Sequence, residues 1–509
     1  MKLLLVSIDS LNRHFLDCYE PSVDRDVETP NLDRFAERAT VFERHYAGSL
    51  PCMPARREWL AGVQEFLWRP WGPAEPFDAL LPERLRAEGT VTQLVTDHYH
   101  YFQHGSGGYV EPFNGFEFVR GHEFDAWKTV PREPERDVAD RIRSPPADDP
   151  DGIGYLNPVQ YARNVDGFAA VEDYFAPKVF SKTASWLEAS ADWDDWFCYV
   201  DSFDVHEPFD VPEPYASMYT DEDPRDPSLN SWPEYGRTDE GDAALTDREL
   251  SFVRSQFAAK LTMADDWFGR VLDALDAGEL WDETAVVVTS DHGFYLGEHG
   301  YVGKPFEAPL YDVLAHTPLF VWHPDASPDR DRVSALTSAV DVYATVLDAF
   351  GLETPDRSHS RSLLPLLTGE RSSVRERALY GYWGSSVNVT DGRYTYLHPC
   401  RADADSYCYS SGAMNPHRPL HPPEPRPDAE PASLPYADAP VWRYPAASYA
   451  RHDEPLLFDT AADPWQECDL AGEGDPAEAR LRGLLVDGLD ELAAPDWQYE
   501  RLGFDGDVA

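Results

Sequence analysis

One cysteine stands in a stretch whose residue types favour chemistry at the start of a helix. Residues 49–62 run Ser-Leu-Pro-Cys-Met-Pro-Ala-Arg-Arg-Glu-Trp-Leu-Ala-Gly, a pattern that predicts the end of a loop followed by a short helix. Pro54 suits the first helical position, where its missing N–H has no partner in any case, and Gly62 suits the left-handed residue that ends a helix. Cys52 is then expected at the mouth of the helix, where free N–H groups and the helix dipole favour an anion.

Polar residues follow four mainly apolar segments, at the points where strands are predicted to end. These segments have the composition expected of strands that are covered on both faces of a sheet. In open α/β sheets, ligands bind beyond the carboxyl ends of the strands, so we expect the polar side chains to converge. The segments are 3–8, 91–95, 196–200 and 284–289. The residues that follow them are Asp9 and Ser10, Asp97 to His100, Asp201 to His206, and Asp291 and His292.

Two of these clusters together offer the ligands of a metal site. Asp9, Asp291 and His292 supply carboxylate and imidazole groups, which predicts a site for a hard divalent cation. A single aspartate after a strand more often caps the next turn or helix. Four such clusters, together with Cys52, favour a catalytic site instead.

The order of the predicted elements defines the fold class. Strands alternate with helices over most of the chain, which predicts an α/β fold with a large, mostly parallel sheet sandwiched by helices. The clearest helix covers 247–277, where apolar residues recur at roughly helical spacing. Short segments between 378 and 397, with an Asp-Gly turn at 391–392, instead predict antiparallel strands. A strand at 456–459 and a helix near 477–492 complete this smaller α+β part.

We therefore predict two domains, a catalytic domain over residues 1–375 and a smaller C-terminal domain over residues 376–509. The polar stretches at 105–175 and 210–245 show little periodicity. We interpret them as insertions or loops near the site, the first as a lid. The proline-rich residues 415–440 predict a surface excursion.

The charge balance excludes some functions. The net charge is -49, from 92 acidic against 43 basic residues, which weighs against nucleic-acid binding because that needs a basic face. The acidic residues are spread along the whole chain. We therefore favour a halophilic protein in a salty cytoplasm, where dense surface carboxylates stay hydrated and screened; an ordinary acidic protein is the alternative.

Cysteine use and the first residues favour a cytoplasmic location. The six cysteines are scattered without a Cys-x-x-Cys pair, so we expect free thiols. The apolar run 1–8 is too short for a signal peptide and continues directly into Asp9. No stretch is long enough to span a membrane. The sequence does not predict the oligomeric state.

Several segments resemble the sulfatase family, which lies within the alkaline phosphatase superfamily. Residues 52–56, Cys-Met-Pro-Ala-Arg, and 60–62, Leu-Ala-Gly, are similar to the family signature Cys-x-Pro-Ser/Ala-Arg followed by Leu-x-Gly. Residues 289–304, which contain Asp291, His292 and Lys304, resemble the second signature. The other motifs of the resemblance are the first strand with Asp9, His206-Glu207-Pro208-Phe209, and the stretch from Phe458 to Leu470.

The resemblance implies a site built around a modified residue. In sulfatases the cysteine at the position of Cys52 is oxidised to Cα-formylglycine by a maturation enzyme, and the hydrated aldehyde attacks the ester. The resemblance also implies one divalent metal, calcium first, with manganese or magnesium as alternatives. The implied metal ligands are Asp9, Asp291, His292 and the group at Cys52. The implied groups for the transferred anion are Arg56 and Lys304, with His206 as acid or base.

Two positions depart from the family pattern. Many sulfatases carry a second aspartate after the first metal aspartate, where this chain has Ser10, a weaker candidate ligand. Many also have Gly-Lys-Trp-His after the strand that follows the nucleophile helix, where residues 97–100 are Asp-His-Tyr-His. His98 and His100 would then take the places of that Lys and His and contact the transferred group, in a pocket that titrates near neutral pH.

The predicted function is the hydrolysis of sulfate esters of small molecules or glycans. A phosphonate monoester or phosphodiester hydrolase with the same site is the first alternative, because Asp-His in place of Asp-Asn at the metal tilts toward the phosphonate hydrolases. A catalytically silent binder of sulfated ligands is the second, and the intact set of site residues argues against it. A metal-dependent phosphatase that uses Cys52 or Ser49 directly is the third.

Overall fold

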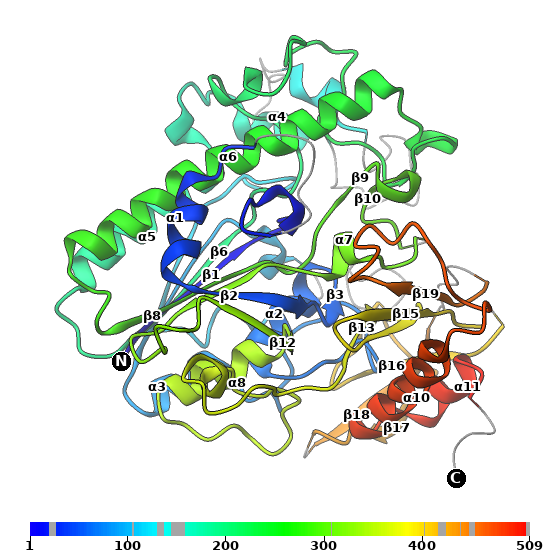
Figure 1. The fold of residues 1–509 in the computed structure, drawn as a ribbon. Helices are drawn as coiled ribbons and strands as arrows, with labels where there is room; N and C mark the ends of the chain where they lie inside the picture. The colour runs from blue at the N-terminus through cyan, green and yellow to red at the C-terminus, as the bar shows by residue number, and fades with distance from the viewer. Residues whose placement is uncertain are drawn as a thin grey trace.

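The computed structural model describes residues 1–19, 27–103, 106–129, 137–143, 158–306, 308–401, 403–415, 424–437, 439–446 and 453–504. Within these ranges the chain forms one large sheet and three smaller ones, with helices on both faces of the large sheet (Figure 1). Parts of the segments predicted at 105–175 and 415–440 lie outside the described residues.

The central element is an eight-stranded sheet in the order β12-β2-β11-β8-β1-β6-β4-β5. Every neighbouring pair is parallel except the two pairs made by β11, which runs against β2 and β8. The predicted α/β fold with a mostly parallel sheet is therefore confirmed. The strands are β1 Lys2–Ile8, β2 Thr40–Tyr46, β4 Val91–Thr96, β5 Gly115–Phe118, β6 Trp196–Ser202, β8 Thr284–Thr289, β11 Leu319–Trp322 and β12 Arg332–Ser338. Three of these strands, β2, β5 and β12, were not predicted from the sequence.

The two faces of this sheet carry two separate cores. Side chains of β1 alternate between them, because successive residues of a strand point to opposite faces. Leu4 and Val6 join one core, which α1 (Pro30–Arg38), α5 (Phe175–Ser190) and α6 (Asp247–Ala277) cover. Leu3 and Leu5 join the other, under α2 (Cys52–Ala61), α3 (Leu81–Ala87) and α8 (Asp341–Ala349). Figure 1 shows these two groups of helices on opposite sides of the sheet.

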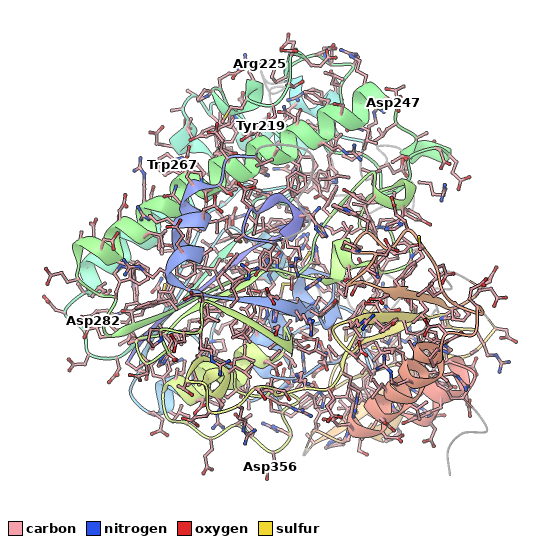
Figure 2. The ribbon with its side chains drawn as sticks, viewed as in Figure 1. Tyr219, Arg225, Asp247, Trp267, Asp282 and Asp356 are labelled. Carbon is pink, nitrogen blue, oxygen red and sulfur yellow. The ribbon has the colours of Figure 1, made fainter. Side chains whose placement is uncertain are left out.

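The long helix α6 has the bounds that its sequence predicts. Thr246 caps its N-terminus by accepting a hydrogen bond from the backbone N–H of Glu249, whose side chain in turn accepts from the backbone of Thr246. This reciprocal pair satisfies N–H groups that have no partner inside the helix. Figure 2 labels Asp247 at the start of α6 and Trp267 further along it.

A second sheet of five strands brings the C-terminal part of the chain to the Cys52 segment. Its order is β19-β15-β14-β13-β3, and β3 pairs in parallel with β13, Ser49 opposite Gly381 and Leu50 opposite Tyr382. The strand that leads into Cys52 is therefore held by the C-terminal sheet. The boundary between 375 and 376 stays a prediction. The strands are β3 Ser49–Leu50, β13 Ala378–Tyr382, β14 Val387–Thr390, β15 Tyr394–His398 and β19 Leu456–Asp459.

One detail of the sequence-based expectations was wrong. The helix α2 starts at Cys52, so Pro54 is its third residue and not its first; this still lies in the first turn, where a missing N–H costs no hydrogen bond. The proline-rich stretch contains the strand β17 (Glu430–Ser433), which pairs with β18 (Pro440–Ala446), although its side chains are mostly exposed, as a surface segment requires. Gly62 does end α2 in the left-handed region, with φ of 70°.

The remaining elements are short, apart from the C-terminal helix α10. None of the six cysteines, all of which lie in the described residues, forms a disulfide in the structure. In the described part of the chain, no helix has the length and apolar character needed to cross a membrane. The remaining elements are α4 Pro158–Val165, α7 Asp312–Ala315, α9 Leu364–Leu367, α10 Pro476–Glu491, α11 Asp496–Arg501, β7 Gly236–Arg237, β9 Tyr295–Leu296, β10 Tyr301–Gly303, β16 Ser406–Ser410 and the 3-10 helix η2 Tyr99–Phe102.

Candidate active site

Four residues from three elements form a buried group that can hold a cation. Ligand atoms of Asp9, Cys52, Asp291 and His292 all lie within 4.8 Å of one another. Asp9 follows β1, Asp291 and His292 follow β8, and Cys52 begins α2. The carboxyl ends of these strands meet because β1 and β8 are parallel neighbours, so the predicted convergence of Asp9, Asp291 and His292 at one edge of the sheet is confirmed.

The electrostatics of this group fit a divalent cation. Burial and the neighbouring carboxylate of Asp291 raise the pKa of Asp9 well above its usual value. Oδ2 of Asp9 is buried and forms an ion pair with Arg56 at 2.9 Å, without the geometry of a hydrogen bond. A second cation between the two buried carboxylates would further relieve their repulsion. Oxygen and imidazole ligands suit calcium, magnesium or manganese.

The imidazole of His292 is oriented for metal binding. Its Nδ1 lies 2.8 Å from the backbone oxygen of Gly293, so Nδ1 donates its hydrogen there and Nε2 keeps its lone pair. Nε2 lies 3.3 Å from Sγ of Cys52. Burial lowers the pKa of His292 to about 4, which keeps the ring neutral at ordinary pH. A neutral ring is the form that binds a metal.

Ser10 supports both carboxylates of the group. Its hydroxyl donates to Oδ1 of Asp9 at 2.8 Å, and its backbone N–H donates to Oδ1 of Asp291 at 3.1 Å. Its φ of 59° is in the left-handed region, which is uncommon for a residue with a side chain. The structure therefore gives Ser10 hydrogen-bonding contacts with the two aspartates, while its role as a metal ligand stays a prediction.

Arg56 lies fully buried among three carboxylates. Its guanidinium pairs with Asp291, with Asp9 at 2.9 Å and with Asp201 at 2.8 Å. Although burial acts to lower the pKa of Arg56, these three carboxylates raise it well above the usual value. Tyr101 adds a hydrogen bond to Asp201 at 2.8 Å. Arg56 is thus a permanent cation that compensates the acidic edge of the sheet.

Lys304 and His206 face the same region. The ammonium of Lys304 lies 3.6 Å from Oε1 of Glu207 and has no hydrogen-bond partner among the described residues. Burial acts to lower its pKa, but Glu207, Cys52 and Asp9 raise it above the usual value. Nδ1 of His206 lies 2.8 Å from the backbone oxygen of Glu207. Burial and the charge of Lys304 lower the pKa of His206 well below its usual value, so the ring is neutral at rest.

His98 and His100 adjoin each other, with ring centroids 5.0 Å apart. Nδ1 of His98 lies 3.5 Å from Asp201, and burial together with Arg56 lowers its pKa well below the usual value. Nε2 of His100 lies 3.0 Å from Oε2 of Glu123, and burial lowers its pKa as well. Both histidines are therefore buried, neutral and adjacent to the site, but their contact with a transferred group stays a prediction.

The sequence analysis missed Glu123. This residue lies in the stretch 106–129, inside the segment that we interpreted as an insertion near the site. Oε2 and Oε1 of its carboxylate lie 3.0 Å from Nε2 of His100 and 3.1 Å from Nδ1 of His206. The preceding residue, His122, contacts Asp204 at 2.9 Å. No motif or periodicity in that stretch marked either residue.

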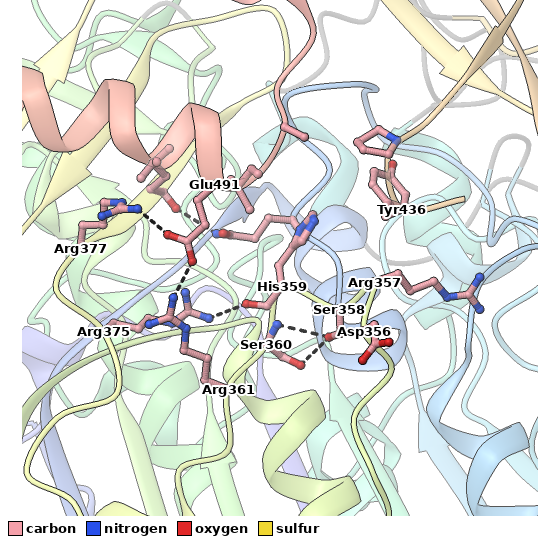
Figure 3. Close-up of a pocket in the computed structure, with 16 residues that line it drawn as sticks. Asp356, Arg357, Ser358, His359, Ser360, Arg361, Arg375, Arg377, Tyr436 and Glu491 are labelled. Atoms are coloured by element: carbon pink, nitrogen blue, oxygen red, sulfur yellow. Dashed lines mark hydrogen bonds and ion pairs between the residues drawn. The ribbon is translucent and has the colours of Figure 1, made fainter. Parts of the chain in front are cut away.

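A cavity of about 350 Å³ lies elsewhere, and none of the predicted site residues lines it. In Figure 3, two of its arginines, Arg361 and Arg377, pair with Glu491. Arg375 pairs with Asp341. The pairs with Glu491 join the last residue of α10 to the segment before β13. The side chains of the candidate active site, by contrast, are buried, with Cys52 2% and Lys304 7% exposed.

The large, mostly parallel sheet between helices, with buried carboxylate, imidazole and thiol groups at the ends of its strands, is an alkaline phosphatase-like fold. The sulfatase family profile matches residues 2–352. The chain therefore belongs to the sulfatase family, a class of sulfuric ester hydrolases.

Individual relatives agree with this assignment. The multifunctional alkaline phosphatase superfamily protein PehA of Trinickia caryophylli is 26% identical over 542 residues, which covers 94% of this chain and 92% of PehA. The N-acetylglucosamine-6-O-sulfatase of Bacteroides thetaiotaomicron is 36% identical over 155 residues, 30% of this chain and 27% of that enzyme. The crystal structure of the phosphonate monoester hydrolase of Agrobacterium radiobacter has a TM-score of 0.64 at 20% identity, over 97% of this chain and 95% of that one. At this identity the likeness shows a shared fold.

Proposed function

We propose that this protein hydrolyses sulfate esters with a formylglycine made from Cys52 and one divalent metal. The observation that carries the proposal is the position of Cys52, which starts α2 with its sulfur 3.3 Å from Nε2 of His292. An aldehyde at this position would supply, once hydrated, an oxygen nucleophile beside the metal ligands. A metal held by Asp9, Asp291 and His292 would supply a Lewis acid for the anionic ester.

The chain's own residues perform the remaining tasks. Lys304 is a buried cation without a hydrogen-bond partner among the described residues, so its ammonium can bind the oxygens of the transferred group. His206 would give a proton to the leaving oxygen or take one from the second hydroxyl. Arg56 holds the carboxylates of Asp9 and Asp291 in place through its ion pairs.

The second candidate is the hydrolysis of phosphonate monoesters or phosphodiesters by the same residues. The observation that favours it is the pair Asp291-His292 at the metal group, together with neutral histidines at positions 98 and 100 in place of a permanent cation. Both ester classes carry one negative charge on the transferred group.

The test combines mass spectrometry with turnover. The peptide that contains Cys52 is examined in protein produced together with a formylglycine-generating or equivalent maturation enzyme, and an aldehyde in place of the thiol is expected. The oxidised protein is then assayed at molar KCl with 4-nitrophenyl sulfate and 4-nitrophenyl phenylphosphonate, with calcium, manganese or magnesium. Faster sulfate turnover supports the proposal, and faster phosphonate turnover supports the second candidate. If the oxidised, metal-loaded protein hydrolyses neither ester, the result contradicts both hydrolase proposals and supports a catalytically silent binder of sulfated ligands.

The location and salt habitat are proposals that rest on composition alone. We infer a cytoplasm of high salt from the net charge of -49 and its even spread. Fractionation of the source cells, followed by immunodetection, tests the location. Glycan sulfates are the natural substrate class to screen, because several sulfatase relatives are named for them, among them the N-acetylglucosamine-6-O-sulfatase.

A further inference from the structure

Two histidines of the candidate site share one carboxylate. Oε2 of Glu123 lies 3.0 Å from Nε2 of His100, and Oε1 lies 3.1 Å from Nδ1 of His206. Glu123 is 3% exposed. Its φ of 45° is in the left-handed region. Backbone strain of this kind persists where the surrounding structure holds the residue firmly, often at functional sites.

The residues around Glu123 anchor it on both sides. His122 contacts Oδ1 of Asp204 at 2.9 Å, and the same oxygen pairs with Lys260 at 2.6 Å. Two residues after Glu123, the carboxylate of Asp125 accepts hydrogen bonds from Arg120 and from the backbone N–H of Gly121. Residues 120–125 are therefore held by hydrogen bonds among themselves and by the contact of His122 with Asp204, in the loop that carries His206. These contacts give the Glu123 carboxylate a fixed position.

This geometry selects the tautomers of both rings. A carboxylate accepts hydrogen bonds only, so Nε2 of His100 must donate and its Nδ1 keeps the lone pair. That Nδ1 is buried without a hydrogen-bond partner among the described residues. Nδ1 of His206 lies near the Glu207 carbonyl and Glu123, both acceptors, so it carries the hydrogen and Nε2 keeps the lone pair. Nε2 is then the atom of His206 that can exchange a proton with a substrate.

The charge of Glu123 adds to its hydrogen bonds. Although burial acts to raise its pKa, the pairing with His100 and hydrogen bonds from His100 and Tyr99 lower it. Glu123 is therefore an anion, and an anion beside an imidazole stabilises the protonated ring. Other charged or titratable groups also face this region: Lys304 disfavours protonation of His206, and so do His122 and His100 when charged. The carboxylate of Glu207 lies 3.5 Å from Nδ1 of His206, and Lys260 donates a hydrogen bond to the backbone oxygen of His206.

We propose that Glu123 is a positioning residue for ester hydrolysis: its carboxylate fixes the tautomer of His100, acts with the backbone oxygen of Glu207 on Nδ1 of His206, and stabilises the proton that His206 carries during the reaction. The inference rests on the proposed function, in which His206 is the acid or base. It assigns a task to the stretch 106–129 that no sequence motif marks. The general form of the arrangement is a carboxylate that orients a catalytic imidazole.

The test compares Glu123→Gln with the matched control Glu117→Gln. Glutamine keeps the size of the side chain but removes the charge and one acceptor. Glu117 belongs to the same stretch, on β5, is half exposed and pairs with Lys182. In Glu123→Gln we expect kcat for 4-nitrophenyl sulfate to fall by about 100-fold, KM to change less than about threefold, and the histidine limb of the pH–rate profile to move to lower pH. We expect Glu117→Gln to match wild type.

A second readout is independent of turnover. Proteins labelled with nitrogen-15 in histidine, assigned with His100→Gln and His206→Gln variants, report the tautomer of each ring by NMR. We expect a protonated Nδ1 at His206 and a protonated Nε2 at His100 in wild type, and altered populations in Glu123→Gln. Unchanged ring nitrogens, or a kcat loss without a shift of the pH limb, would overturn the inference. If wild type hydrolyses no ester, the proposed function fails, while the NMR result still decides the role of Glu123.

Discussion

The sulfur of Cys52 lies 3.3 Å from Nε2 of His292, although 240 residues separate the two in the chain. The contact joins the N-terminus of α2 to the carboxyl end of β8. A group formed from the cysteine side chain would therefore lie beside any cation that His292 binds. Because Cys52 and His292 lie together, the nucleophile and the metal can be tested as parts of one site.

Replacing Cys52 by alanine should abolish turnover. The change removes the precursor of the nucleophile, so we expect kcat to fall by at least about 1,000-fold, with the melting temperature nearly unchanged because alanine fits the same buried space. Steady-state kinetics and thermal denaturation measure both. Retained activity would point to another nucleophile such as Ser49, although the Ser49 hydroxyl already accepts hydrogen bonds from the backbone N–H groups of Glu65 and Phe66.

Replacing Arg56 by methionine should destabilise the protein strongly. Three buried carboxylates, those of Asp9, Asp201 and Asp291, would lose their cation, and breaking a buried pair costs about 3–5 kcal/mol. Thermal denaturation measures the loss. The matched control is Arg34→Met, because Arg34 is 44% exposed in its pair with Asp273 and exposed pairs contribute about 0.2–1 kcal/mol. Equal losses in the two variants would contradict the role given to Arg56.

Removing the metal should lower both activity and stability. Asp9 and Asp291 would keep only their pairing with Arg56, and a ligand present at about 100 times its Kd stabilises a protein by about 2.7 kcal/mol. We expect a chelator to lower the melting temperature, and calcium, manganese or magnesium to restore it to different extents. The Asp9→Asn variant should lose most of this response. An identical melting curve with and without chelator would show that the group holds no metal.

Acid should destabilise the protein through buried histidines such as His45. Burial lowers the pKa of His45 to about 3, whereas an unfolded histidine titrates near about 6.5. As the pH falls below about 6.5, the unfolded chain binds a proton that the folded chain does not, so stability is lost by about 1.4 kcal/mol per pH unit for this one group.

The His45→Asn variant isolates this contribution. Asparagine can keep a hydrogen bond to Thr337, whose hydroxyl lies 2.9 Å from Nδ1 of His45, but it does not titrate. Thermal denaturation between about pH 7 and pH 5.5 should therefore show a shallower loss of stability in the variant than in wild type. Parallel curves would show that His45 takes up its proton in the folded state as readily as in the unfolded state.

Salt should stabilise the fold if the acidic surface is an adaptation. With a net charge of -49, self-repulsion is strong at about 0.1 M KCl, where the Debye length is about 10 Å, and weak at about 1 M, where it is about 3 Å. We expect the melting temperature to rise steadily over this range and beyond. A melting temperature that does not respond to KCl would favour the ordinary acidic protein.

Much of the fold followed from local patterns. The strands before Asp9 and Asp291 are short apolar runs, and a run that is buried on both faces is visible in the sequence itself. The helix α6 carries its own N-terminal cap at Thr246. The strands β2 and β12 were missed because β2 contains charged residues, Glu43 and Arg44, in its second half. Their pairing with each other at the sheet edge, not their composition, makes them strands.

The sequence by itself determined which residues could do chemistry: Cys52 before a helix, and carboxylates and histidines after apolar strands. Spacing and composition suffice there, because each strand and helix is specified by its neighbours in the chain. Only the tertiary structure decided that Glu123 lies beside His206 and that Arg56 pairs with three carboxylates. It also decided that β3 pairs with β13 of the C-terminal sheet. Such contacts join distant segments, and the packing that decides them leaves no periodic signal in either segment.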